Sequence, residues 1–284
     1  MNTAIEIVGY GGLVPGVIAI AVYRLALWLP AGAGPRFSAA LAFASAFFVG
    51  YVLMPDWAEL APTRHWHWLP YLAGMAAILG AVGLADGVSI VDRWLLQGLL
   101  AIVGGWLLVP DWASLQPSRA VYVPLLSVYF VVLCAALDGL PERLPGRLFP
   151  VLLGVVSVAS TISIAFFVSV KLGQVAGIAT AGLLGCGVAN LTRPTSVASR
   201  GVIPGYVVIV GGLAFVAGIE PEPPLLALLL IPAAPLALWS CAWGPLSRTR
   251  GYAGAASQFA AVLLPAAVGF VAVFLTQGGA DRGY

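Results

Sequence analysis

The stretch Gly105-Trp-Leu-Leu-Val-Pro-Asp-Trp-Ala-Ser-Leu-Gln-Pro-Ser-Arg119 repeats an earlier one, Gly50-Tyr-Val-Leu-Met-Pro-Asp-Trp-Ala-Glu-Leu-Ala-Pro-Thr-Arg64. Nine of the fifteen positions are identical at an offset of 55 residues, and an apolar run precedes and follows each copy. A fixed offset with apolar flanks predicts a repeated helical hairpin whose turn carries an acid, an indole and a base.

The composition around this repeat predicts an integral membrane protein. Charged residues make up 8% of the chain and hydrophobic residues 61%, with a mean hydropathy of +1.01. A soluble domain carries about 25% charged residues, so water cannot be the main solvent of this chain and a lipid bilayer is its expected partner. The net charge of +2 is too small and dispersed for nucleic-acid binding. The chain also lacks the motifs of nucleotide, haem and zinc sites, so we expect no cofactor.

The apolar runs divide into helices of membrane length. A bilayer core of about 30 Å requires about 20 apolar residues per helix. The fold class is therefore all-α, a single membrane domain over residues 1–284 with about ten transmembrane helices in consecutive hairpins. One long apolar region must be divided near Lys171-Leu-Gly-Gln174 to reach that number. The spans are expected at 5–28, 38–54, 69–85, 94–109, 121–137, 148–169, 172–190, 201–219, 224–243 and 256–277.

The basic residues predict the orientation. Nine arginines fall on one side of this layout and four basic residues on the other. The positive-inside rule then places the arginine-rich side in the cytoplasm and both termini outside, in a cell (inner) membrane. Five arginines each precede an outward-going helix, at spacings of 57, 54, 53 and 50 residues: Arg36, Arg93, Arg147, Arg200 and Arg250.

This spacing suggests hairpin units at about 36–86 and 93–138, with less similar ones at 147–190 and 200–246. Sequence identity supports only the first two. For the others, similar helix lengths combined with the positive-inside rule would produce the same spacing.

The outer loops contain the most distinctive residues. In each copy, an Asp and an Arg stand eight residues apart across a turn that contains two prolines. One interpretation is a capped turn whose indole lies at the lipid headgroup level. The other is an outer gate, or a surface that docks a membrane-protein partner or a second copy of the chain. The residues concerned are Asp56, Trp57, Arg64, Asp111, Trp112 and Arg119.

The first loop also holds both histidines, His65 and His67, with Asp56 and Glu59 nearby in sequence. Two imidazoles at i and i+2 share a side only in an extended segment, and a metal ion would need a third ligand. The alternation with tryptophan is more typical of an aromatic belt at the membrane interface, and we assign no metal. A pH-sensitive outer surface is the remaining alternative.

Ionisable side chains are absent from the middle of the expected spans. Asp138 closes a helix at the cytoplasmic side, where Arg93, Arg143 or Arg147 could neutralise it. The polar side chains that remain inside are uncharged, and such groups either bond neighbouring helices or contact a solute. Interior prolines such as Pro232 and Pro265 could open helix carbonyls to a cavity. The candidate substrate-binding residues are Ser160, Thr161, Ser163, Gln174, Asn190 and Gln258.

Two functions fit this pattern. The first is a transporter-like bundle for a small neutral or weakly polar solute, bound among the polar and kinked helices. The second is a non-catalytic membrane subunit or scaffold that docks a partner through its outer Pro-Asp-Trp-Ala loops, and the lack of mid-membrane charge favours it. We expect no enzymatic activity, because catalysis would have to use Asp56, Glu59, His65 and His67, whose spacing fits no catalytic motif.

Overall fold

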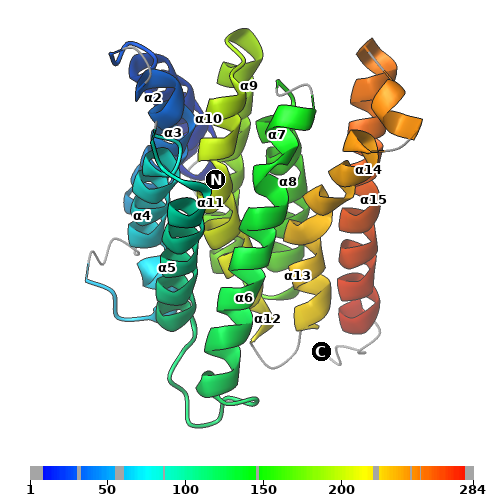
Figure 1. Cartoon of the computed structure of the whole chain (residues 1–284). Coiled ribbons are helices and arrows are strands. Elements are labelled where there is room, and N and C mark those ends of the chain that lie inside the picture. The colour runs from blue at the N-terminus through cyan, green and yellow to red at the C-terminus, as the bar shows by residue number, and fades with distance from the viewer. Residues whose placement is uncertain are drawn as a thin grey trace.

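The protein is a bundle of helices, seen here in a computed structural model that describes residues 9–30, 33–54, 61–85, 87–144, 147–219, 224–243, 245–249 and 251–278. Every regular element within these ranges is a helix (Figure 1). The first half contains η1 (Gly9–Leu13), α2 (Val14–Ala26), α3 (Ala33–Val52), η2 (His65–Trp68), α4 (Leu69–Val82), α5 (Ile90–Leu108), α6 (Arg119–Asp138) and α7 (Leu140–Arg143). The second half contains α8 (Phe149–Phe167), α9 (Val170–Thr192), α10 (Ser196–Gly201), α11 (Ile203–Tyr206), η3 (Val207–Gly211), α12 (Gly212–Gly218), α13 (Leu225–Ala233), η4 (Ala234–Leu238), α14 (Trp239–Ala242), η5 (Pro245–Arg248) and α15 (Gly251–Gly278).

Eight of these helical segments are long and apolar enough to cross a bilayer. A continuous helix satisfies its own backbone hydrogen bonds, which is the condition for crossing lipid. The chain is therefore a multi-pass membrane protein. The eight segments are α3, α5, α6 with α7, α8, α9, α10 to α12, α13 to α14, and α15.

Two of the ten expected spans correspond to shorter helices. The first expected span contains an apolar helix at Gly11–Ala26, and the third contains α4, which has 14 residues. At a rise of 1.5 Å per residue, α4 alone is roughly 21 Å long, less than the bilayer core. The number of ten spans and their arrangement as hairpins therefore remain predictions.

The expected division near Lys171 falls slightly earlier in the chain. Helix α8 ends at Phe167 and α9 begins at Val170, so Val168 and Ser169 form the turn. The side chain of Ser169 accepts a hydrogen bond from the Leu172 amide and caps α9. The long apolar region is two helices, and Lys171 belongs to the first turn of the second.

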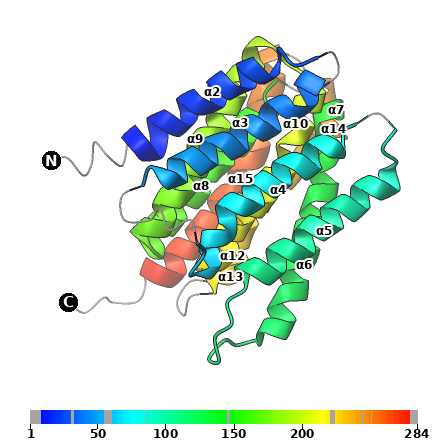
Figure 2. The same cartoon turned by 90° about the vertical axis from the view of Figure 1, so that its left-hand side faces the viewer.

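The segment from α10 to α12 lies at the centre of the bundle, since every residue in its apolar window is buried, whereas α5 and α15 are the least buried of the long helices. Figure 2 shows α2, α3, α4 and α5 side by side across one face, in that order. Helix α9 packs closely on both α2 and α8. A Cβ atom on Gly185 would lie 2.5 Å from the Gly16 carbonyl oxygen, and one on Gly187 would lie 2.7 Å from the Val151 side chain. Only glycine allows these approaches.

The described arginines of the predicted cytoplasmic loops gather at one end of the bundle, the end that carries α7, α10 and α14 in Figure 1. Arg24 donates to the Thr192 hydroxyl, and the Arg36 carbonyl approaches Gly201. Arg93 and Arg200 meet at Asp138. We call this the arginine end, and the end that carries Arg64 and Arg119 the outer end. Which end faces the cytoplasm stays a prediction.

Candidate functional site

Three of the predicted substrate-binding residues share one property in the structure. Ser160, Ser163 and Gln258 are buried, and the two serine hydroxyls and the Gln258 Oε1 atom have no hydrogen-bond partner among the described residues. Buried polar atoms are nearly always paired, so each unpaired one requires a physical explanation. These three side chains, called the polar seam below, are the candidate solute site.

Two residues of the polar seam lie on α8 and one lies on α15. Ser160 and Ser163 lie at i, i+3 on α8, and Phe167 continues the same stripe one turn later. Phe167 contacts α15, with ring centroids 5.9 Å from Phe270 and 6.1 Å from Phe274. Gln258 belongs to a buried stripe of α15 made of Gly254, Gln258, Val262, Ala266, Gly269 and Val273. This stripe packs on α13, because a Cβ atom on Gly269 would lie 3.0 Å from the Ala227 carbonyl oxygen. The stripes that carry the three polar groups are thus those through which α8 and α15 pack into the bundle.

The other three predicted substrate-binding residues lie elsewhere. The Thr161 hydroxyl is 2.8 Å from that of Thr180 and links α8 to α9. Gln174 is half-buried near the start of α9, close to the outer end. Whether either contacts a solute stays a prediction.

Asn190 lies at the arginine end, in a hydrogen-bonded network. Its Oδ1 atom accepts from the Tyr23 hydroxyl at 2.9 Å, and its Nδ2 atom donates to the Arg147 carbonyl at 3.3 Å. These bonds tie α2 and α9 to the segment before α8. Packing therefore accounts for the burial of Asn190 without a solute.

Two carbonyls at the Pro232 kink accept hydrogen bonds from tyrosine side chains. After Pro232, helix α13 continues as the 3-10 helix η4, and the buried α10 to α12 segment contains the π-helical turn η3. The Tyr206 hydroxyl donates to the Pro232 carbonyl at 2.7 Å, and the Tyr129 hydroxyl donates to the Leu229 carbonyl at 3.0 Å. Two tyrosines thus occupy carbonyls that a kinked helix could have offered to a solute.

At the outer end, residues from both copies of the repeat line one open groove of about 530 Å³. Arg64 comes from the first copy, and Asp111, Trp112 and Arg119 from the second. Arg119 lies 3.8 Å from Asp111, as the loop pattern predicted, but its Nη2 atom also donates to the Trp106 carbonyl at 2.8 Å. Its guanidinium carbon is 4.5 Å from the centroid of the Trp106 ring. Asp56, Trp57 and Glu59 lie outside the described residues.

The two histidines make different contacts in this region. His65 meets the Trp112 ring edge-on at a centroid distance of 5.3 Å, and its Nε2 atom is buried without a partner among the described residues. His67 stacks edge-on against Trp66, and its Nδ1 atom is 3.2 Å from the Thr63 hydroxyl. Burial, with smaller contributions from His67 and Arg64, lowers the pKa of His65 to about 4, so it is neutral at pH 7. The described ranges contain no group of three His, Cys, Asp or Glu side chains placed to hold a metal ion.

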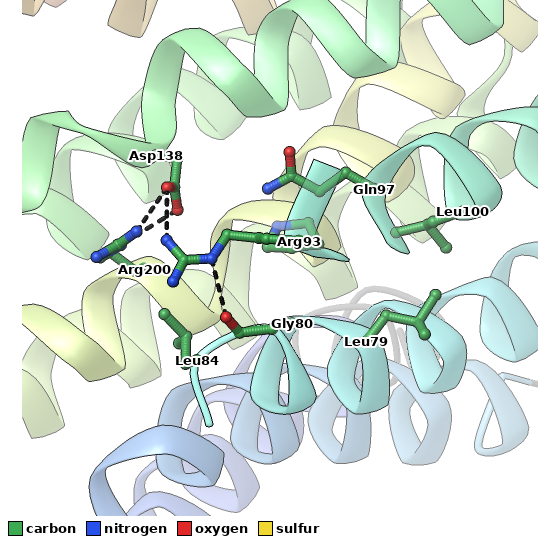
Figure 3. A pocket seen from close by; sticks show the side chains of 10 residues that line it. Leu79, Gly80, Leu84, Arg93, Gln97, Leu100, Asp138 and Arg200 are labelled. Carbon is green, nitrogen blue, oxygen red and sulfur yellow. Dashed lines mark hydrogen bonds and ion pairs between the residues drawn. The ribbon is translucent and has the colours of Figure 1, made fainter. Parts of the chain in front are cut away.

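A third cluster, of charged residues, lies at the arginine end (Figure 3). The Asp138 carboxylate accepts from Arg93 at 3.2 Å and from two nitrogens of Arg200, at 2.6 and 3.2 Å. Arg200 also pairs with Glu142, and Arg93 donates to the Gly83 carbonyl. Arg93 is one of the three alternative partners of Asp138 expected from the sequence, beside Arg143 and Arg147. Arg200 was missed because it lies 62 residues from Asp138.

The cavity beside this cluster is too small for a solute. Its volume is about 20 Å³, enough for a single water molecule. Gln97 also lines this cavity, together with Arg93 and Asp138 (Figure 3). The cluster joins α5, α6, α7 and α10, so its evident role is to hold these elements together.

No protein family, no curated protein and no solved structure matches this chain. A functional assignment therefore depends on the three clusters described above.

Proposed function

We propose that the protein is a transporter-like bundle that moves a small neutral or weakly polar solute, with the polar seam of α8 and α15 as the binding site. The observation that supports this most is the set of three buried polar atoms without partners in Ser160, Ser163 and Gln258. Leaving a buried polar group unsatisfied costs about 1–3 kcal/mol. A solute with hydroxyl or amide groups would supply the missing hydrogen bonds and offset that cost.

The surrounding helices favour an uncharged solute. Helices α8, α13 and α15 carry no Asp, Glu, Lys, Arg or His. A charge inside the membrane is expensive unless an opposite charge is nearby. The site would therefore discriminate against ions and accept a molecule that forms a few neutral hydrogen bonds.

The proposed topology has ten spans in consecutive hairpins, with α2 and α4 added to the eight long segments. An even number of crossings places both termini on one side of the membrane. The gathering of described arginines at one end supports a cytoplasmic position for that end, with the termini outside, in an inner membrane.

The test is solute flux into liposomes that contain the purified protein, across a panel of neutral metabolites. The double variant S160A/S163A should abolish both flux and stabilisation by the transported solute. S157A is the matched control, because the Ser157 hydroxyl already donates to the Leu153 carbonyl at 2.8 Å. Absence of flux and of solute stabilisation across the panel, or equal effects of the two changes, would contradict the proposal.

The second candidate is a non-catalytic subunit that docks a membrane partner at the outer end. The groove between the repeat copies favours this role, because Trp112 there is 44% exposed. The same groove is lined by the Asp111–Arg119 pair and by Arg64. Purification from native membranes should then recover one stoichiometric partner, which W112A would release while S160A/S163A would retain it. Recovery of the same proteins with W112A as with the unchanged chain would exclude this role.

A further inference from the structure

The outer groove carries an excess of positive charge. Among its described lining residues are two guanidinium groups, Arg64 and Arg119, and one carboxylate, Asp111. The side chain of Asp111 is 88% exposed and lies 3.8 Å from Arg119, so solvent screens the pair. Arg64 has no ion-pair partner within the described ranges. Over its described lining residues, the groove therefore carries two positive charges and one negative charge.

Two nitrogen atoms of this groove are buried without a hydrogen-bond partner in the described structure. They are Nε of Arg119, an obligatory donor, and Nε2 of His65. The Trp106 carbonyl holds one edge of the Arg119 guanidinium, and the Trp112 ring packs against His65. Arg119 and His65 are thus held in place at the groove by aromatic neighbours.

An apolar strip of α5 leads to the groove. Leu95, Leu99, Ile102 and Trp106 recur at intervals of three and four residues, and each is more than half exposed. They therefore form one face of a membrane-spanning helix, the kind of surface that acyl chains cover. The strip ends at Trp106, on which Arg119 stacks. The exposed apolar face of α5 matches the acyl chains of a phospholipid, and the charged groove at the end of that face matches its phosphate group.

We propose that this groove binds the phosphate group of an anionic phospholipid between Arg64 and Arg119, with the acyl chains along the exposed face of α5. Arginine pairs with phosphate through parallel N–H···O bonds, which a point charge cannot reproduce. The site goes beyond both candidate functions, because it requires neither solute transport nor a protein partner.

The experiment measures binding of short-chain phosphatidylglycerol to the purified full-length chain in a neutral detergent, by native mass spectrometry and by thermal stabilisation. Phosphatidylcholine and inorganic phosphate alone are the comparison ligands. R64Q and R119Q should each weaken phosphatidylglycerol binding about tenfold, the effect of losing one charge-assisted contact. D111N removes the competing carboxylate and should strengthen binding several-fold.

R193Q is the matched control, because Arg193 is an exposed arginine at the opposite end of the bundle. It should leave binding unchanged. Should R119Q fail to fold, R64Q and D111N still test the site, since they predict changes in opposite directions. Equal binding of phosphatidylglycerol and phosphatidylcholine, or insensitivity to all three groove substitutions, would overturn the proposal. Binding of inorganic phosphate as strong as that of the lipid would also overturn it, because the groove would then be a site for free phosphate.

Discussion

Asp138→Asn should be among the most damaging single-charge substitutions in this protein. The Asp138 carboxylate accepts three hydrogen bonds from two arginines, and the side chains of Asp138 and Arg200 are only 24% and 14% exposed. Removing one partner of a buried ion pair costs about 3–5 kcal/mol, because the other charge is left without compensation. Because the two side chains are partly exposed, solvent reduces this cost, and we expect the free energy of unfolding to fall by about 2–3 kcal/mol.

Asp111→Asn is the matched control, since it also removes a carboxylate paired with an arginine. That pair is separated by 3.8 Å and the Asp111 side chain is 88% exposed, so its loss should cost less than about 1 kcal/mol. The measurement is unfolding of the purified protein in mixed micelles, followed by circular dichroism at increasing denaturing detergent. Equal losses for the two substitutions would refute the inference that the Asp138 cluster holds α5, α6 and α10 together.

Three further predictions concern packing, polarity and pH. Gly185→Ala should destabilise the protein by about 1–3 kcal/mol, because the added Cβ atom would lie 2.5 Å from the Gly16 carbonyl oxygen. Gly177→Ala is the control and should cost little, because its Cβ atom would lie 3.8 Å from the Thr161 side chain. Similar unfolding midpoints of the two variants would contradict this prediction. Without solute, S160A/S163A should leave stability unchanged or raise it, since it removes buried hydroxyls that have no described partner; a loss of stability would show that these hydroxyls are paired. The pKa of His65 is lowered to about 4 from 6.5, so below pH 6.5 the unfolded chain binds more protons there. Stability should therefore fall as the pH drops from 6.5 to 4, less so in H65Q, and identical pH profiles of the two proteins would disprove the burial of His65.

The sequence alone could predict what depends on composition and local pattern. Lipid as the solvent follows from the scarcity of charge, and a helix break near Lys171 follows from the length limit of one span, since α8 and α9 cannot together form a single crossing. The position of the break could not be predicted as well, because it depends on Ser169 capping α9. The Asp111–Arg119 pair was predictable, because both residues belong to one short loop.

Contacts between distant segments could not be predicted from one sequence. Arg200 reaches Asp138 only because the buried α10 to α12 segment passes beside the end of α6. The two repeat copies meet in one groove because η2 packs against the end of α5, and no spacing within either copy indicates this. The polar pattern also could not distinguish Asn190, which is hydrogen-bonded at the arginine end, from Ser160 and Ser163, whose hydroxyls have no hydrogen-bond partner among the described residues.

The central claim is that the chain crosses the membrane with its arginine end on one side and its repeat loops together on the other. The most direct measurement is labelling of single introduced cysteines at Thr63, Trp112, Arg147 and Arg193 by an impermeant thiol reagent in intact cells and inverted vesicles. The background should be low, because Cys134, Cys186 and Cys241 are all buried. We predict that positions 63 and 112 react from one side and positions 147 and 193 from the other. Labelling of positions 112 and 193 from the same side would contradict the account.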